Sequence, residues 1–220
     1  MTAQRQLFRG SRRHVADLAL AGRRRTLAVE LPAEADAVRT EVRAFLDRLR
    51  QQDHSDWTVS IVEAGYLVPY WPRPWGRAAG PIEQLVVDEE FSAAHVRRPH
   101  LQVGAWVLPT LITHGTAAQQ ERWIGPTMRG EILWCQMFSE PGAGSDLASL
   151  TTRAERIEGG WRLTGQKVWT TMAQLAQWGI CLARTGPLPA GGGTGPRTDR
   201  HEGITCFMVD MGADGLDIRP

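Results

Sequence analysis

The residues best suited to hold a ligand lie in one short turn, residues 139–145, which follows an apolar run at residues 132–138. The turn contains Gly142 and Gly144, and serine hydroxyl groups stand at its two ends. Glycine lets the backbone take positive φ angles and lets a ligand approach closely, and free main-chain N–H groups can hold an anion or the polar rim of a heterocycle. This turn is therefore the first candidate for a binding site.

Two interpretations of this turn follow from the local residues alone. A dinucleotide-binding turn has the pattern G-x-G-x-x-G, but Leu147 stands where the third glycine belongs. The residues that follow favour a strand rather than the helix that such a turn needs, because Thr151, Thr152 and Ile157 are β-branched. The alternative is a glycine-rich hairpin turn that binds no ligand.

A third interpretation depends on a second motif further along the chain. The turn reads S-E-P-G-A-G-S-D from Ser139, and the residues from Gly165 to Thr171 read G-Q-K-V-W-T-T. Both motifs, in this order and at this spacing, resemble the acyl-CoA dehydrogenase family, and the resemblance covers roughly residues 33–220. Ser139 replaces the threonine that is commoner in the family, and Thr170 stands where isoleucine is frequent. The joint match is specific, whereas either motif alone would be weak.

The resemblance implies that this part of the chain binds FAD, with the edge of the isoalloxazine ring against the predicted strand and turn. A flavin needs hydrogen-bond donors at its N1, O2, O4 and N5 edge, because they stabilise the charge gained on reduction. The implied donors are main-chain N–H groups near Phe138 and the hydroxyls of Ser139 and Thr171. Trp169 would pack its aromatic face against the ring, although a core tryptophan is the alternative. The implied FAD-binding set is Gln136, Met137, Phe138, Ser139, Gly144, Ser145, Trp169, Thr170 and Thr171.

The resemblance also implies a reaction, the α,β-desaturation of an acyl-CoA thioester, and Ser145 is implied to face that acyl-CoA substrate. Electrons would pass to an electron-transfer flavoprotein, and the protein would be a homo- or hetero-oligomer. In the family the general base is a glutamate of a C-terminal helical domain, so we expect it beyond Pro220 and assign no catalytic residue within the chain. Glu140 is interpreted as a structural acid.

Two other functions stay open on the sequence. One is a non-catalytic fragment or subunit that acts by pairing with a full-length partner. The other is a derivative of a flavin monooxygenase of the same fold, in which reduced flavin meets oxygen. Because the chain is expected to lack the general base, we expect no desaturation of acyl-CoA by these 220 residues alone.

The elements that must position the site fall into three stretches. We expect residues 1–31 to be a flexible, arginine-rich leader. The family resemblance implies an all-helical N-terminal domain at residues 32–130 and an incomplete middle β domain at residues 131–220. A helical half followed by a β half predicts an α+β fold. The family resemblance implies that the β half is antiparallel or barrel-like.

Prolines and capping residues mark where the predicted helices begin or are interrupted. Pro81 is suited to the first turn of a helix, and Thr116 with Gln119 forms a capping-box pattern at the start of another. A helix predicted over residues 101–113 contains Pro109, which should kink or break it. After residue 130 the hydrophobic period changes, and turns that contain glycine separate most of the apolar runs. Strands are predicted at residues 132–138, 151–157, 161–164, 167–171, 178–184 and 204–210.

Composition excludes several classes of protein. The net charge is +1, so there is no strong field to attract nucleic acid or a membrane surface, and no apolar run approaches the ~20 residues that span a bilayer. The three cysteines, Cys135, Cys181 and Cys206, are far apart and lack the close pairing of a metal site. Each lies in an apolar run, which predicts buried free thiols and a reducing, cytoplasmic location.

Overall fold

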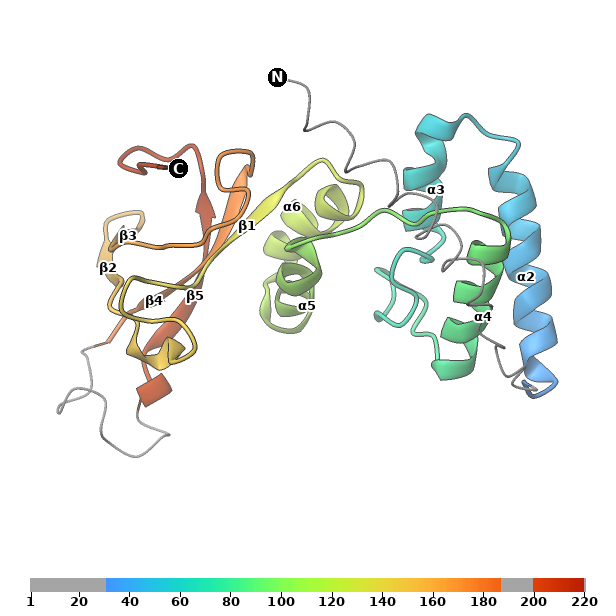
Figure 1. Cartoon of the computed structure of the whole chain (residues 1–220), viewed down its shortest axis with the longest axis horizontal. Helices are drawn as coiled ribbons and strands as arrows, with labels where there is room; N and C mark the ends of the chain where they lie inside the picture. Colours follow the sequence, from blue (N-terminus) through green and yellow to red (C-terminus); the bar gives the residue numbers. More distant parts are fainter. Residues whose placement is uncertain (1–30, 187–199, 220) are drawn as a thin grey trace, which may run out of the picture.

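The computed structural model describes residues 31–186 and 200–219, so the predicted leader lies outside the described residues except for Leu31. Helices come first along the chain and strands follow, which confirms the predicted α+β class (Figure 1). The helices are α2 (Glu34–Leu49), α3 (Trp57–Glu63), α4 (Pro81–Ala93), α5 (Gly104–His114) and α6 (Ala117–Met128). The strands are β1 (Trp134–Met137), β2 (Arg153–Ile157), β3 (Gly160–Thr164), β4 (Trp178–Arg184) and β5 (Ile204–Asp210).

The helices follow from their apolar spacing and their first residues. In α2, Val42 and Leu46 lie one turn apart and both are buried. Pro81 is the first residue of α4, as predicted. The capping box at the start of α6 is also confirmed, because Thr116 N donates to Gln119 Oε1 at 2.8 Å and Gln119 N donates to Thr116 Oγ1 at 3.3 Å.

The sequence predicts a kink or a break at Pro109, but α5 continues through it from Gly104 to His114, so the helix does not break there. A proline removes one main-chain donor, but the neighbouring residues Leu108 and Leu111 are buried in the core and hold the helix in place. Helices α5 and α6 approach closely, since a Cβ atom on Gly104 would lie 2.8 Å from Cγ2 of Thr127. Tertiary packing thus outweighs the local preference of the proline.

The sheet is mixed rather than antiparallel, and the described residues do not close it into a barrel. β4 pairs in parallel with β1, antiparallel with β5, and in parallel with the start of β2, which forms a hairpin with β3. The predicted antiparallel or barrel-like arrangement therefore needs correction. A long connection that contains the β2–β3 hairpin runs from β1 to β4, and such a crossover allows the two strands to lie parallel.

The strand predicted at residues 167–171 does not form. This segment is irregular, because Trp169 has φ +58° and Met172 has φ +67°, which turn the backbone out of the extended conformation. β2 also starts later than predicted, at Arg153, and the main-chain N–H groups of Thr151 and Thr152 donate to the Glu140 side chain. At Thr151 and Thr152, hydrogen bonds to a side chain thus take the place of strand pairing.

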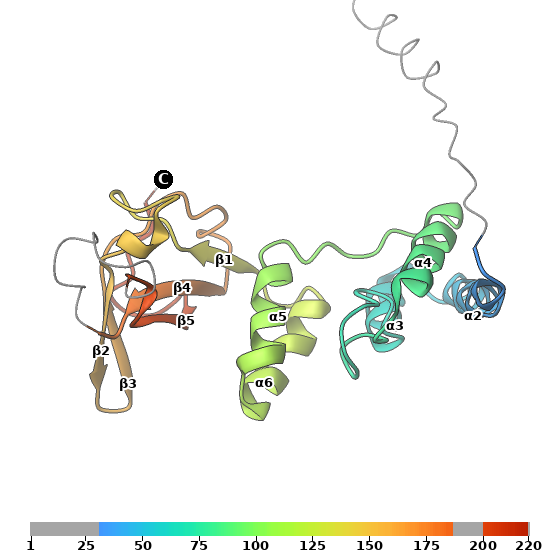
Figure 2. The same ribbon diagram turned by 90° about the horizontal axis from the view of Figure 1, so that it is seen from below.

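One apolar core runs from the helices into the sheet. Trp134 of β1 is 1% exposed, and its indole N–H donates to Thr127 Oγ1 of α6 at 2.8 Å. Trp123 and Trp178 lie with their ring centroids 6.3 and 6.2 Å from that of Trp134. Figure 2 shows α5 and α6 between the sheet and the α2–α4 group. The helical hairpin therefore joins the two halves of the chain.

A second, smaller apolar cluster contains residues of β1 and β4, including Cys135 and Cys181. Both are buried free thiols, as predicted, but Cys206 is exposed in the described chain, which corrects the third cysteine. Burial raises the pKa of Cys135 and of Cys181 to about 11, so neither is a reactive thiolate. Within residues 31–186 and 200–219, no helix is long and apolar enough to cross a membrane, and no three potential metal ligands gather.

Candidate functional site

The predicted turn at residues 139–145 follows β1 and is closed by two main-chain hydrogen bonds. Glu140 N donates to the Ala143 carbonyl at 2.7 Å, and Ala143 N donates back to the Glu140 carbonyl at 3.1 Å. Gly144 and Ser145 follow and are exposed. Among the described residues, the main-chain N–H groups of Ser139, Gly144 and Ser145 have no hydrogen-bond partner. The turn therefore presents free donors to solvent or to a ligand.

The carboxylate of Glu140 is the centre of this region. Oε2 accepts from Thr151 N at 2.7 Å and Thr151 Oγ1 at 2.8 Å, and Oε1 accepts from Thr152 N at 2.9 Å and Thr152 Oγ1 at 2.5 Å. Burial alone would raise the pKa of Glu140, but the hydrogen bonds from Thr152, Thr151 and Lys167 outweigh it and lower the pKa to about 2. Glu140 is therefore ionised at neutral pH, which supports its interpretation as a structural acid.

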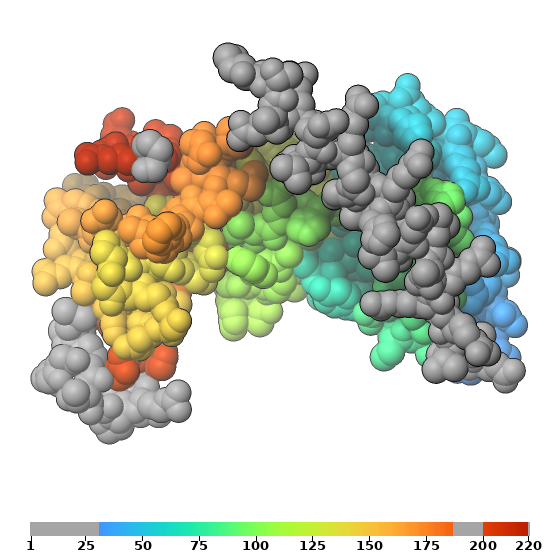
Figure 3. Space-filling view, viewed as in Figure 1, coloured from blue at the N-terminus to red at the C-terminus, as the bar shows by residue number. Residues whose placement is uncertain are grey.

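Lys167 brings the two sequence motifs together. Its ammonium group lies 2.9 Å from Glu140 Oε1 and also donates to the Phe138 carbonyl at 3.2 Å. The next residue, Val168, donates its main-chain N–H to the Ser139 carbonyl at 2.9 Å. In Figure 3 the segments coloured yellow and orange, on either side of residue 160, lie against one another on the visible face. The two motifs therefore form one surface.

Gly165 explains why the second motif begins with glycine. A Cβ atom at this position would lie 2.4 Å from Thr152 Oγ1 and 2.8 Å from Thr152 Cα, closer than packed atoms approach. The missing side chain lets the segment pass directly over Thr152, whose hydroxyl donates to Glu140. Gly165 and Lys167 thus both bring this segment against the group formed by Thr152 and Glu140.

The predicted aromatic residue is fully accessible. Trp169 is 89% exposed and holds a left-handed backbone conformation, φ +58°, which non-glycine residues rarely adopt. Thr171 is also exposed, and its N–H donates to the Trp169 carbonyl at 3.0 Å. The Oγ1 atom of Thr170 is buried without a hydrogen-bond partner among the described residues. An exposed, strained tryptophan beside an unsatisfied hydroxyl is typical of a ligand-binding surface.

The remaining predicted residues lie on β1 and just beyond it. Met137 is 9% exposed and packs in the second apolar cluster, so only its main chain could face a ligand. Gln136 is half-buried, and Phe138 packs partly against the core that joins helices and sheet. The structure therefore brings Phe138 and Ser139 to Lys167 and Val168, and turns the Met137 side chain away.

Sequence reasoning did not find the partners of Glu140. Thr151, Thr152 and Lys167 hold the carboxylate, although the sequence suggested only that Thr151 and Thr152 were strand residues. One signal was present: Lys167 is the only lysine in a chain with 25 lysine and arginine residues. A cation chosen differently from all the others marks a position with particular geometric demands.

Sequence reasoning also did not find the buried Arg184. Its guanidinium donates to the main-chain carbonyls of Ala148 at 2.5 Å, Leu150 at 3.0 Å, Arg200 at 3.0 Å and Glu202 at 3.1 Å. The residues after the turn are thereby tied to the segment that leads into β5. Arg184 thus fixes the far end of the turn region through backbone contacts alone.

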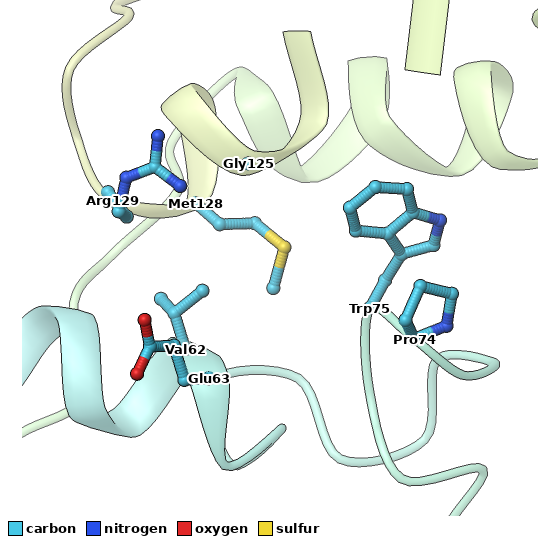
Figure 4. Close-up of a pocket in the computed structure, with 7 residues that line it drawn as sticks. All are labelled: Val62, Glu63, Pro74, Trp75, Gly125, Met128 and Arg129. Atoms are coloured by element: carbon cyan, nitrogen blue, oxygen red, sulfur yellow. The ribbon is translucent and has the colours of Figure 1, made fainter. Parts of the chain in front are cut away.

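A separate hollow of about 140 Å³ lies between α3, α6 and the irregular segment that contains Pro74 and Trp75. Figure 4 shows the Met128 side chain extending into this space towards Val62. Its remaining lining residues are Glu63, Gly125 and Arg129. None of the predicted site residues lines it, so it is not part of the candidate site.

The described residues fit one wall of a flavin site. They offer unpaired main-chain donors at Ser139, an unsatisfied hydroxyl at Thr170 and an uncovered aromatic face at Trp169. A flavin ring system needs donors along its polar edge and an apolar surface against its face. The chain supplies both chemistries from two segments that Lys167 and Glu140 fasten together.

Family models match both halves of the chain. The model of the acyl-CoA dehydrogenase N-terminal domain matches residues 32–131, and that of the acyl-CoA dehydrogenase middle domain matches residues 135–220. The chain is 50% identical over 208 residues to acyl-CoA dehydrogenase FadE34 of Mycobacterium tuberculosis. The aligned region covers 94% of this chain and 28% of FadE34.

The chain is also similar to solved structures. In the ChsE4–ChsE5 complex from Mycobacterium tuberculosis, one chain aligns with a TM-score of 0.59 and 26% identity, over 85% of this chain and 49% of that one. The FAD complex of PigA has a TM-score of 0.55 at 18% identity, over 87% of this chain and 51% of that one, and shows likeness of fold alone. The chain thus spans between about a quarter and a half of the length of these relatives.

Proposed function

Because the chain belongs to the acyl-CoA dehydrogenase family, we propose that it forms the flavin-facing part of an FAD-dependent oxidoreductase that desaturates an acyl-CoA thioester. One observation carries this proposal. The exposed face of Trp169 and the free donors of the turn at residues 139–145 lie on segments that Glu140 and Lys167 join directly. FAD, when bound there, supplies the acceptor for the hydride that leaves the β-carbon of the substrate.

The proposed FAD contacts divide into three kinds. Main-chain N–H groups near Phe138, Ser139 and Gly144 would face the polar edge of the ring. The hydroxyls of Ser139, Thr170 and Thr171 would add donors, and Trp169 would cover one face of the ring and exclude water. Gln136 and Met137 contribute through β1, with Met137 limited to its main chain. Ser145 would face both the cofactor and the acyl-CoA.

The proposed context extends beyond the described residues. We propose an electron-transfer flavoprotein as electron acceptor, with the general base supplied from outside the 220 residues. A related chain was solved in the ChsE4–ChsE5 complex, which supports a homo- or hetero-oligomer. We also propose that the chain divides into a helical domain, residues 32–130, and a β domain, residues 131–220. The three free cysteines support a cytoplasmic location.

Titration of the purified 220-residue chain with FAD tests this function. We expect the flavin spectrum to shift on binding, and we expect Trp169→Ala and Thr171→Val to weaken that binding. Within a complete enzyme, losing one donor at a developing charge should slow flavin reduction by ~10²–10³. Trp106→Ala is the matched control, since Trp106 is a 58% exposed tryptophan on α5. Equal FAD affinity in all variants would contradict the site.

A further inference from the structure

Glu140 and Lys167 form an ion pair that is almost closed to water. Their side chains are 4% and 6% exposed, and Nζ lies 2.9 Å from Oε1. Thr151 and Thr152 direct four further donors at the same carboxylate. A carboxylate has about four lone-pair directions, so Glu140 is saturated with donors. Removing one partner of such a pair leaves a buried charge without full compensation.

The choice of lysine at position 167 fits this space. Lys167 is the only lysine of the chain, and arginine supplies every other permanently cationic side chain. An ammonium group is a compact donor with three N–H bonds, whereas a guanidinium is a planar fork. The single Nζ atom reaches both Glu140 Oε1 at 2.9 Å and the Phe138 carbonyl at 3.2 Å. One small cation therefore fastens the segment that contains Lys167 to both Phe138 and Glu140.

The pair lies beside the residues proposed to contact FAD. Glu140 directly follows Ser139, and Lys167 stands two residues before Trp169. Between these positions, Val168 N donates to the Ser139 carbonyl at 2.9 Å. Trp169 holds φ +58° while 89% of its surface is exposed, so its own side-chain packing contributes little to this conformation. A strained conformation of this kind persists only when neighbouring structure imposes it.

We propose that Glu140 and Lys167 are positioning residues that hold residues 167–171 against the turn at 139–145, so that Trp169 and the free turn donors form one wall. The proposal rests on the proposed function, because FAD is the ligand of that wall. Neither side chain has to touch the cofactor. Their effect is exerted through the Val168–Ser139 hydrogen bond and through the backbone conformation of Trp169.

Binding of FAD to four forms of the 220-residue chain provides the first test: wild type, Glu140→Gln, Lys167→Met and Glu90→Gln. Glu90 is the matched control, because its side chain is similarly buried, at 7% exposed, and is paired with cations but lies in α4. We expect the Kd for FAD to rise about tenfold to hundredfold in the first two variants, the range seen for residues that orient a metal ligand. In Glu90→Gln it should stay unchanged.

Two further measurements need no cofactor. Labelling with ¹⁵N-lysine gives a single amide signal in the chain, that of Lys167. This signal should move in Glu140→Gln and stay in place in Glu90→Gln. Hydrogen exchange at the Val168 amide should quicken at least about tenfold in Glu140→Gln and Lys167→Met, while the amides of α5 and α6 keep their protection. Unfolding of the whole chain would instead expose all of them.

The outcomes separate this proposal from the proposed function. If the wild type binds FAD and the two variants lose affinity together with Val168 protection, the positioning role is supported. If the wild type does not bind FAD but the Val168 amide still opens in both variants, FAD binding by this chain fails and the positioning role stands. Unchanged Val168 exchange in both variants overturns the positioning role, whatever the chain does with FAD.

Discussion

Two buried carboxylates, one in each half of the molecule, are held in different ways. Glu90 and Glu140 are each 6% exposed. Glu90 of α4 accepts from Arg39 at 2.5 Å and from Arg43 at 2.7 and 3.1 Å, and both arginines belong to α2. Glu140 accepts from a lysine and from the hydroxyls and main-chain N–H groups of Thr151 and Thr152, which belong to no strand or helix.

The difference shows what each half needs from its side chains. In the helical half, backbone hydrogen bonds are satisfied within α2 and α4, so Glu90 only links two elements that already exist. In the β half, Thr151 and Thr152 come before β2 begins, so Glu140 supplies the acceptors that a neighbouring strand would have offered. The Glu140 side chain therefore holds the backbone of the candidate site in place by accepting from the main-chain N–H groups of Thr151 and Thr152.

Replacing each carboxylate by its amide tests this contrast most strongly. Glu140→Gln should lower the free energy of unfolding by about 3–5 kcal/mol, because the amide nitrogen faces donors and Lys167 loses its partner in a space closed to water. Glu90→Gln should cost less, about 1 kcal/mol, since the two cations that it leaves behind, Arg39 and Arg43, have side chains that are 25% and 62% exposed and can be solvated by water. Urea denaturation of both variants and wild type measures the two losses.

Equal losses in the two variants would remove the distinction between the halves. Circular dichroism in the far ultraviolet serves as the control for folding, because α2 and α4 should keep their helical signal in both variants.

The stability of the chain should also depend on pH through the ionisation of Glu140. The pKa of Glu140 is lowered from 4.5 to about 2, so its contribution to stability is fully present above about pH 4.5 and is lost as the pH falls towards 2. The loss is on the order of 3 kcal/mol, since one pKa unit corresponds to 1.36 kcal/mol. Subtracting the unfolding free energy of Glu140→Gln from that of wild type at each pH isolates this carboxylate. A difference that does not change between pH 5 and 2.5 would rule out the lowered pKa.

Gly165 and Gly142, both close to Glu140 in the structure or the sequence, differ in whether a Cβ atom has room. Gly165→Ala should cost about 1–3 kcal/mol, because its Cβ would lie 2.4 Å from Thr152 Oγ1. Gly142→Ala is the matched control in the turn, where nothing lies within 4 Å of the new Cβ, and should change stability by less than about 0.5 kcal/mol. Thermal unfolding of the two variants measures this, and comparable shifts in Tm would show that Gly165 does not make the close contact.

The fold could be predicted from the sequence where local rules and packing agree. The capping box at Thr116 and the proline at the start of α4 are local signals, and both are confirmed. The break at Pro109 failed because buried neighbours hold α5, and the strand at 167–171 failed because Trp169 takes a left-handed conformation. Neither periodicity nor propensity reports contacts between residues far apart in the chain.

The candidate site shows the same limit. The two motifs could be recognised from residue types and spacing, and Glu140 could be read as structural. Its partners could not, because Thr151 and Thr152 fit a strand pattern equally well, and the role of Lys167 depends on a contact 27 residues away along the chain. The parallel pairing of β1 with β4 was likewise hidden, since glycine turns suggest hairpins.

Replacing an exposed tryptophan by glycine in each half should give the smallest change in the free energy of unfolding, and the two changes should differ in sign. Trp169→Gly should leave the unfolding free energy unchanged or raise it by about 0.5 kcal/mol, because glycine adopts φ +58° freely and this gain of about 1–2 kcal/mol exceeds the entropy that glycine adds to the unfolded chain. Trp106→Gly should lower it by about 0.5 kcal/mol, since Trp106 lies within α5 and glycine is a poor helix former. Urea denaturation compares them. If Trp169→Gly destabilises the chain as much as Trp106→Gly, the left-handed conformation of Trp169 stores no strain, and its exposure alone would remain as the mark of the site.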